Sequence, residues 1–545
     1  MIKKAFNLLN NISGLHQTAY LLAFFALLSQ LLALLRDRLL AHSFGAGGIL
    51  DIYYASFRIP DFIFIMVASI VSISVLVPFL AEEINREQGK RFMSEVFSVF
   101  LLLIIIVCSF AFFLIPKVTP LILVGFSQEA INQVINLSRI LLLSPVLLGL
   151  SNFFTSIIQI NQKFFIYALS PLLYNIGIII GIVFFYPIWG LKGLVFGVIL
   201  GAFFHLIIQL PSIYRLGSLP KFVYTFNFKK IKEIIILSLP RTLALSTSNL
   251  ALIFLVGLAS TLGEGAVSIF TFSFSLQSVP LSIIGVSYSI AAFPVLAKLF
   301  SNNQVDVFFQ QITTAARHIV FWTTVVLVLF IVLRAQIVRT ILGSGKFDWV
   351  DTRLTAACLA AFALSVTAQS LVLLFLRGYY AAGKTIKPVL ISIFSAIVII
   401  ISAFFFKWLF INVEFIKEII GLIFRISDIQ NINVLVLPMS YSLGTFVNAS
   451  LLWFFFQKDF NRFSSSLKKS FFQTLLASFI MGIFAYFSLN LWSFILDITT
   501  FGGIFLQGLF SGIIGLVVLV LVLKLLKNRE IDEVTLTLKR KLHLG

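Results

Sequence analysis

The residues best suited to chemistry are charged side chains inside apolar segments near the N-terminus. Three basic and three acidic residues fall within or beside the first two long apolar runs: Arg36, Asp37, Arg38, Asp51, Arg58 and Asp61. Ionisable side chains are costly in hydrocarbon, so they usually line a cavity or pair with one another. A guanidinium suits phosphate oxygens by charge and by its forked donors. The pattern indicates either a cavity for an anionic ligand, with Arg36, Asp51 and Arg58 as contacts, or a self-neutralising structural cluster.

Three further residues complete the candidate set. Arg241 follows a proline where a later apolar helix is expected to begin, so it either faces the cavity or snorkels toward the cytoplasm. Gly45 and Pro60 lie in the turn and helix beside the charged cluster. For these two residues, and for Asp37 and Asp61, we expect structural or gating roles near the site.

One stretch matches a phosphate-binding loop letter for letter. Residues 378–385 read Gly-Tyr-Tyr-Ala-Ala-Gly-Lys-Thr, which fits the pattern G-x4-G-K-[ST]. That loop works between a strand and a helix of a soluble α/β domain, whereas this stretch ends an apolar segment and precedes Pro388. We interpret the match as accidental, and we predict that the protein is not an enzyme.

Composition shows which elements must carry these residues. The chain has 545 residues, of which 60% are hydrophobic and only 11% are charged, and its mean hydropathy is +1.06. Soluble proteins carry roughly 25% charged residues. The charged residues of this chain are therefore too few to cover a water-exposed surface. The expected fold is an all-α polytopic membrane protein. Both cysteines lie in apolar runs and the five histidines are scattered, so we expect no disulfide, no metal site and no cofactor.

A window of about 19 residues predicts about fourteen transmembrane helices. Their limits are 17–41, 53–80, 93–115, 133–158, 165–187, 190–213, 233–261, 266–296, 316–340, 354–379, 388–410, 434–457, 470–493 and 502–526. Basic residues concentrate in 215–232, 458–469 and 524–541, which predicts that both termini lie in the cytoplasm. The formal net charge of +19 then marks cytoplasmic loops, and no nucleic-acid binding is expected.

The chain also repeats itself. Gly45 and Gly263 mark similar turns, and similar prolines follow at Pro60 and Pro280, at Pro78 and Pro294, and at Pro171 and Pro388, each pair about 216 to 220 residues apart. A constant offset implies two six-helix lobes in the same orientation around a central cavity, a transporter architecture. The predicted parts are an amphipathic segment 1–16, an N-lobe 17–213, a basic linker 214–232, a C-lobe 233–457, two extra helices in 470–526 and a cytoplasmic tail 527–545.

Two kinds of intramembrane residue have structural interpretations. Gly177 and Gly181, and Gly193, Gly197 and Gly201, recur every four residues, which lets helix backbones approach closely. Single polar residues inside spans are expected to form interhelical hydrogen bonds more often than ligand contacts; they are Gln30, Asn175, His205, Gln209, Asn249, Gln277 and Gln369.

Several ordered motifs resemble one family. The N-terminal motifs are Leu35-Arg36-Asp37, Phe44-Gly45-Ala46-Gly47, Asp51, Phe57-Arg58-Ile59-Pro60 and Val77-Pro78-Phe79-Leu80-Ala81-Glu82. They resemble the start of the MurJ/MviN family, the lipid II flippases of peptidoglycan synthesis, within the multidrug/oligosaccharidyl-lipid/polysaccharide exporter superfamily. The resemblance continues in order almost to the end of the chain, through Gln209-Leu210-Pro211, Gly345-Lys346-Phe347, Lys384-Thr385-Ile386-Lys387-Pro388 and Asn448-Ala449-Ser450-Leu451.

The resemblance implies a fold, a location and a mechanism. Members have fourteen spans in two lobes, lie in the bacterial cytoplasmic membrane, and hold a diphosphate headgroup in a cationic cavity while the lobes alternate in access. The extra pair of helices, 470–526 here, is associated with a groove for the polyprenyl tail. The implied partners are a lipid-linked glycan precursor and membrane lipids. We expect a monomer, with cell-wall synthesis proteins as candidate partners.

The chain departs from the family at three cationic positions. It has Gln30, Phe64 and Ser275 where the family places arginine. Two alternatives to lipid II transport therefore stay open within transport: a flippase for another undecaprenyl-linked glycan and a multidrug-type antiporter. A third alternative, of a different class, is a non-transporting membrane scaffold. The sequence does not distinguish a coupling ion from the membrane potential as energy source.

Overall fold

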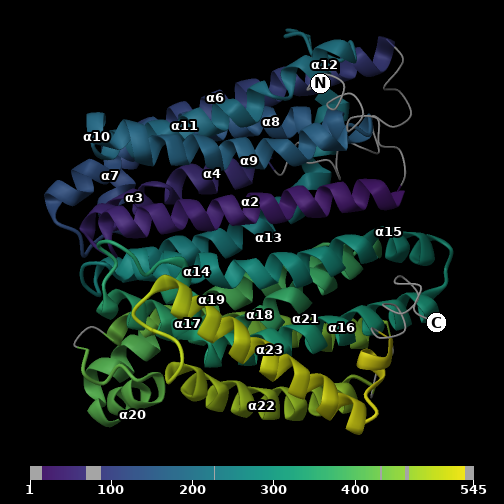
Figure 1. Cartoon of the computed structure of the whole chain (residues 1–545). Coiled ribbons are helices and arrows are strands. Elements are labelled where there is room, and N and C mark those ends of the chain that lie inside the picture. The colour runs from purple at the N-terminus through teal and green to yellow at the C-terminus, as the bar shows by residue number, and fades with distance from the viewer. Residues whose placement is uncertain (1–14, 69–86, 226–227, 430–431, 461–465, 534–545) are drawn as a thin grey trace, which may run out of the picture. The chain divides into compact units, whose positions relative to one another are not determined.

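The computed structural model describes residues 15–68, 87–225, 228–429, 432–460 and 466–533 (Figure 1). Every regular element in these ranges is helical, so the predicted all-α class is confirmed. Twelve helices in these ranges are long and apolar enough to cross a membrane. Of the two other predicted spans, 17–41 coincides with α2 and 53–80 is described only as far as residue 68. The amphipathic segment 1–16 lies almost wholly outside the described residues, as does the repeat landmark at Pro78.

Contacts divide the chain into two compact units, Met1–Val267 and Ser268–Gly545. The helices of the first unit are α2 (Leu15–Phe44), α3 (Gly48–Ser56), α4 (Arg58–Ala68), α6 (Glu87–Ile122), α7 (Gln128–Leu141), α8 (Leu143–Ile160), α9 (Phe164–Ile180), α10 (Tyr186–Trp189), α11 (Leu191–Ile207), α12 (Leu210–Arg215) and α13 (Phe228–Ser260). By its contacts α13 packs on α4 and α6. The division into two lobes that the repeat predicts stays a prediction.

The second unit holds the remaining helices. They are α14 (Ala266–Pro280, from Ser268 onward), α15 (Ser287–Ser301), α16 (Val305–Val332), α17 (Arg334–Ile341), α18 (Trp349–Ala381), α19 (Ile386–Asn412), α20 (Glu414–Phe424), α21 (Val436–Asp459), α22 (Ser466–Ser493) and α23 (Phe501–Leu525). Single π-helical turns lie between α9 and α10, at Gly181–Phe185, and between α14 and α15, at Leu281–Val286. A short 3-10 turn, Ile432–Leu435, precedes α21.

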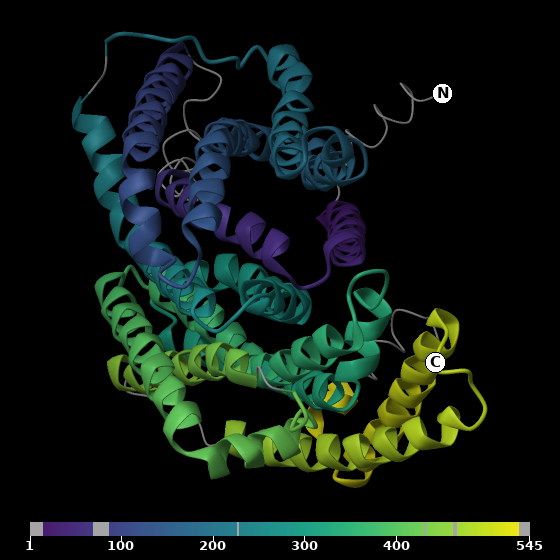
Figure 2. The same cartoon turned by 90° about the vertical axis from the view of Figure 1, so that its left-hand side faces the viewer.

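The α22–α23 pair packs on α16 and forms one wall of the second unit (Figure 2, yellow and yellow-green). Apolar residues of all three helices form this contact, with Phe321 and Val325 on α16 packing beside Met481 on α22 and Leu519 on α23. Just beyond α23, the Glu530 carboxylate lies 3.5 Å from the Nε atom of Arg317, and both side chains are buried. The two C-terminal helices are therefore fixed to the body of their unit.

The glycine spacing produces a close helix contact in the first unit. A Cβ atom added to Gly177 on α9 would lie 2.3 Å from the Cα atom of Gly201 on α11, and one added to Gly181 would lie 2.5 Å from the Cα atom of Gly197. Since the atoms in the way are backbone atoms, they cannot move aside as a flexible side chain would. The interpretation of the spacing as helix packing is confirmed. The helix α9, which carries Asn175, also packs against α2.

We expect Gly197→Ala to destabilise the protein by about 1–3 kcal/mol, because the added methyl group would lie 2.4 Å from the Cα atom of Gly181 and force α9 and α11 apart. Thermal unfolding of the purified protein in detergent measures the effect. The matched control is Gly502→Ala on α23, where a Cβ atom meets nothing within 4 Å and alanine has the better helix propensity. Equal melting temperatures for the two variants would contradict the packing interpretation.

Candidate functional site

The Arg36 guanidinium lies at the centre of the charged cluster in the first unit. Its Nε and Nη2 atoms donate to Asp37 Oδ1 at 2.9 and 2.8 Å, and its Nη1 atom donates to Asn175 Oδ1 on α9 at 3.2 Å. Asp37 is 4% exposed, whereas the Arg36 side chain keeps 23% of its surface exposed. Arg36 is thus held in one orientation by α2 and α9, and its side chain is not fully buried.

The α3–α4 junction brings the second arginine to the same region. The chain bends at Phe57, between the end of α3 at Ser56 and the start of α4 at Arg58. The Ser138 hydroxyl of α7 donates to the Ser56 carbonyl oxygen at 2.9 Å, which satisfies an acceptor at the bend. Arg58 and Asp61 interact electrostatically on the first turn of α4. Arg58 is partly buried and Asp61 is exposed, so the carboxylate lies at an open surface.

Tyrosines lie near both arginines. Tyr53 and Tyr54 of α3 lie near Arg36, and Tyr54 also lies near Arg58. Tyr174 of α9, adjacent to Asn175, interacts with Arg36 and with Asp61. The cluster therefore combines side chains from α2, α3, α4 and α9. Such a set of fixed cations, carboxylates and phenols can bind an anionic group such as a phosphate ester.

Asp51 belongs to a different contact, between two turns that the sequence repeat relates. Its carboxylate is 2% exposed, and Oδ2 accepts a hydrogen bond from the Gly265 backbone amide at 2.7 Å. The Gly48 amide in turn donates to Glu264 Oε1 at 2.8 Å. Gly265 has φ +83° and a Cβ atom there would lie 2.2 Å from the Ala46 carbonyl oxygen, so only glycine fits the close approach.

The remaining predicted residues divide as follows. Gly45 ends α2 with φ +68°, in the left-handed region that favours glycine, and Pro60 is buried in the first turn of α4. Arg241 lies within α13, but its side chain lies outside the described residues. Of the predicted residues, Arg36 with Asp37 and Arg58 with Asp61 thus form two charged pairs, and Tyr54 and Tyr174 lie near both pairs.

Several of the single polar residues that the sequence assigns to interhelical hydrogen bonds form such bonds, whereas Asn249 donates to the Leu245 carbonyl oxygen of its own helix at 3.0 Å. In the first unit, His205 Nδ1 lies 2.6 Å from the Ser151 hydroxyl, and Gln209 Nε2 donates to Ser151 Oγ at 2.7 Å. In the second unit, Gln369 Nε2 donates to Gln277 Oε1 at 3.1 Å. For His205, Gln209, Gln277 and Gln369 the interpretation is confirmed.

Sequence reasoning missed the tyrosines and undervalued Asn175. Asn175 was assigned only to helix contacts, yet its amide oxygen orients Arg36 while its nitrogen donates to the Pro171 carbonyl oxygen at 3.2 Å. Two polar pairs in the sequence could have indicated these residues. Tyr53-Tyr54 lies between Asp51 and Arg58, and Tyr174-Asn175 lies inside an apolar segment. A partner that is 139 residues away from Arg36 in the chain has no signature in local spacing.

The stretch that matches a phosphate-binding loop has a helical context. Gly378 lies inside α18, which ends at Ala381, and Gly383 follows with φ +68°. Lys384 packs its ammonium group 4.7 Å from the centroid of the Phe460 ring. A helix end followed by another helix cannot form the strand–loop–helix cradle that this motif requires.

Comparison with known proteins places the chain among transporters. A family model described as "Lipid II flippase MurJ" matches residues 40–506. Two relatives carry the name "Probable lipid II flippase MurJ". The protein of Buchnera aphidicola subsp. Schizaphis graminum is 26% identical over 85% of this chain and 87% of its own length, and that of Thermotoga maritima is 26% identical over 93% and 95%.

Solved structures share the fold. A lipid II flippase MurJ in an inward closed conformation has a TM-score of 0.74 at 23% identity, and it covers 93% of this chain and 99% of its own. An inward-facing multidrug resistance transporter of the MATE family has a TM-score of 0.64 at 16% identity, over 81% and 96% of the two chains. At these identities the structural likeness establishes the architecture alone.

We expect Asp51→Ala to destabilise the protein by about 1–3 kcal/mol, because it leaves the Gly265 amide without its carboxylate acceptor. Asp51→Asn keeps an acceptor and should lose less. Glu264→Ala, which removes an exposed hydrogen bond to the neighbouring turn, serves as the matched control and should cost under about 1 kcal/mol. Thermal unfolding in detergent distinguishes them, and an Asp51→Ala variant as stable as the control would contradict this role for the carboxylate.

Proposed function

Because the chain belongs to the lipid II flippase MurJ family, we propose that it moves lipid II from the inner to the outer leaflet of the bacterial cytoplasmic membrane. The family match over residues 40–506 carries this conclusion, and the names of relatives that align with most of the chain support it. The cluster around Arg36 supplies a chemical basis, since a diphosphate headgroup needs fixed guanidinium donors. The movement involves no covalent change in the substrate.

In this proposal Arg36 and Arg58 bind the diphosphate. Arg36 is oriented by Asp37 and Asn175 and its side chain stays partly exposed, so it would lose little conformational freedom on binding. The low dielectric of a membrane cavity would strengthen its attraction for phosphate oxygens. Asp61, exposed beside Arg58, would limit the positive charge in the empty site. Arg241 is a further candidate contact by its place in the sequence.

The chain lacks three arginines of the family pattern, with Gln30, Phe64 and Ser275 in their places. This observation favours one second candidate function, a flippase for another undecaprenyl-linked glycan. Both candidates require the same phosphate contacts, because both substrates carry phosphate next to a polyprenyl chain. The two candidate substrates differ in the sugar headgroup, and the rescue experiment described below distinguishes them.

The turns 45–47 and 261–265 form the proposed gate. With the N-terminus in the cytoplasm, as the distribution of basic residues predicts, both turns lie on the extracytoplasmic side. The hydrogen bonds of Asp51 with Gly265 and of Gly48 with Glu264 would hold this side closed while substrate enters from the cytoplasm. Alternating access then requires these bonds to break in each cycle. We accordingly propose a gating role for Asp51 in place of a phosphate contact.

The extra helices are proposed to receive the polyprenyl tail. An apolar cavity of about 390 Å³ lies between α17 and α23, lined mainly by leucine, isoleucine and phenylalanine, among them Ile337, Phe505 and Leu509. The proposed state is a monomer, and cell-wall synthesis proteins are its candidate partners. Either a coupling ion or the membrane potential would supply the energy.

Rescue of cells depleted of their own lipid II flippase tests the function. We expect the chain to restore growth and prevent lysis, Arg36→Ala to abolish rescue because the oriented phosphate contact is lost, and Lys384→Ala to retain it because Lys384 only packs on Phe460. Membrane expression of each variant is measured in parallel.

Two outcomes would contradict the proposal. Failure of the well-expressed chain to rescue would exclude lipid II as its substrate in these cells, and rescue of a strain that lacks another undecaprenyl-linked glycan flippase would then support the second candidate. Equal loss of rescue in the Arg36→Ala and Lys384→Ala variants would contradict the assignment of the site.

A disulfide across the two turns tests the gate. A Cβ atom at Gly48 would lie 3.7 Å from Cγ of Glu264, so the pair Gly48→Cys and Glu264→Cys should cross-link under oxidation. We expect the oxidised protein to lose at least about 90% of its flipping of lipid II in cells and to recover it on reduction, because the turns can no longer separate. Each single variant is a control, since the native cysteines, Cys108 and Cys358, are buried. Normal transport by the cross-linked protein would show that these turns do not gate.

A further inference from the structure

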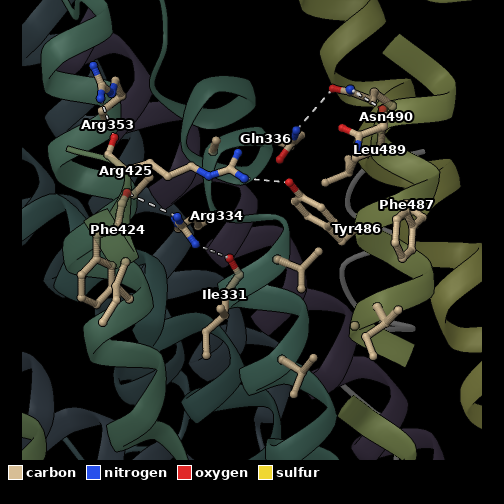
Figure 3. A pocket seen from close by; sticks show the side chains of 18 of the residues that line it. Ile331, Arg334, Gln336, Arg353, Phe424, Arg425, Tyr486, Phe487, Leu489 and Asn490 are labelled. Atoms are coloured by element: carbon tan, nitrogen blue, oxygen red, sulfur yellow. Dashed lines mark hydrogen bonds between the residues drawn. The ribbon is translucent and has the colours of Figure 1, made fainter. Parts of the chain in front are cut away.

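One cavity to which the proposed function assigns no role lies wholly within the second unit. It has a volume of about 950 Å³, within the range of about 300–1,000 Å³ for small-molecule sites. Its walls come from the end of α16, from α17, from the start of α18, from the end of α20 and from α22, with Gln507 of α23. Figure 3 shows three arginines at its polar end, Arg334, Arg353 and Arg425, opposite Tyr486 on α22.

Among the residues that the structure describes, a carboxylate neutralises one of these three charges. Arg353 donates through Nη1 to Asp428 Oδ2 at 2.6 Å, and this contact holds the pKa of Asp428, in the loop after α20, below its usual range. The carboxylate therefore stays ionised and compensates Arg353. Within the described part of the chain, neither Arg334 nor Arg425 forms an ion pair with a carboxylate.

The two uncompensated guanidiniums are fixed close together. Arg334 donates to the carbonyl oxygens of Ile331 at 3.0 Å and Phe424 at 3.3 Å, and Arg425 donates to the Tyr486 hydroxyl at 2.7 Å across the cavity (Figure 3). Their positive charges act on one another. Like charges that are held together at the edge of an apolar region are unfavourable unless an anion joins them.

Arg425 also holds an uncommon backbone conformation. It ends α20 with φ +59°, in the left-handed region that side-chain-bearing residues rarely adopt, and its carbonyl oxygen accepts a hydrogen bond from Arg353 Nη2 at 2.5 Å. Simple snorkelling to water would need neither this backbone geometry nor the hydrogen bond to Tyr486. The arrangement instead directs Arg425 toward the cavity.

The other end of the cavity is apolar and open. Phe479, Ile483 and Phe487 of α22 line it, and they are 64%, 40% and 66% exposed. Ile423 of α20 is 64% exposed on the same lining. In a membrane such surfaces meet acyl chains. The cavity is therefore cationic at one end and lipid-accessible at the other, which is the polarity of a phospholipid with an anionic headgroup and not that of a free anion.

We propose that this cavity is a binding site for an anionic phospholipid of the surrounding bilayer, with its phosphate between Arg334 and Arg425 and its acyl chains along Phe479, Ile483 and Phe487. The arginines lie where α16 ends and α18 begins, at a membrane boundary. With the N-terminus in the cytoplasm this boundary faces the outer leaflet. The site is separate from the Arg36 cluster, and it does not depend on which glycan the protein transports.

Lipid binding to the purified, delipidated full-length protein tests the proposal. Dioleoyl phosphatidylglycerol is titrated and the bound lipid is counted by native mass spectrometry. We expect the double variant Arg334→Gln/Arg425→Gln to bind at least about tenfold more weakly, because two charge-assisted contacts to phosphate are lost. The charge-matched control is Lys346→Gln/Lys417→Gln, which removes two positive charges near the same boundary from residues that do not line the cavity, and it should bind as the unmodified chain does.

Parallel measurements identify the ligand and guard against misfolding. Zwitterionic phosphatidylethanolamine should bind at least about tenfold more weakly than phosphatidylglycerol, and undecaprenyl phosphate and inorganic phosphate should not displace phosphatidylglycerol at equal concentration. If the glutamine variant does not fold, Arg334→Lys/Arg425→Lys keeps both charges and should bind with an intermediate affinity. Equal loss in the control pair, equal binding of the zwitterionic lipid, or displacement by either of the other two anions would each overturn the proposal.

Discussion

The cost of placing guanidinium charge inside an apolar helix bundle is the constraint that organises this protein. Arg36 satisfies it with two bonds to its neighbour Asp37 and a third to Asn175 on another helix. The third bond requires α9 to lie against α2, and α9 is placed in turn by the glycine contact with α11. Packing that involves no charge thus determines where the central charge points. A cation held in this way is available to a ligand because its own helix has already neutralised it.

The second unit meets the same constraint differently. Arg353 has a carboxylate partner in Asp428, but Arg334 and Arg425 are satisfied only by carbonyl and hydroxyl oxygens, which accept hydrogen bonds and do not cancel charge. The first cluster is nearly neutral before a ligand arrives, whereas this cavity keeps two positive charges. A nearly neutral site suits a ligand that must be released in every cycle. A site with two positive charges suits a ligand that is retained. In the two proposals, the arginines of the first cluster bind phosphate transiently and those of the cavity bind it persistently.

The repeat-related turns have a separate physical basis. Asp51 and Glu264 each accept a hydrogen bond from a backbone amide of the other turn. Backbone donors impose no side-chain identity, so the contact depends on close approach, which the absence of a Cβ atom at Gly265 permits. The similar glycine motifs around Gly45 and Gly263 therefore mark a contact between their two turns, within the first unit.

Sequence and tertiary structure determined different parts of this description. Composition and hydropathy set the helical membrane fold, because so few charges cannot cover a soluble surface, and the motifs from Arg36 to Pro60 were enough to suggest the family. The glycine spacing also predicted its helix contact correctly, because that spacing acts within one helix face. Only the tertiary structure decided that Asn175 orients Arg36, that Asp51 bonds the Gly265 amide, and that Arg334 and Arg425 share a cavity. These partners lie far apart in the chain, and which distant helices meet depends on packing that local residue patterns do not encode.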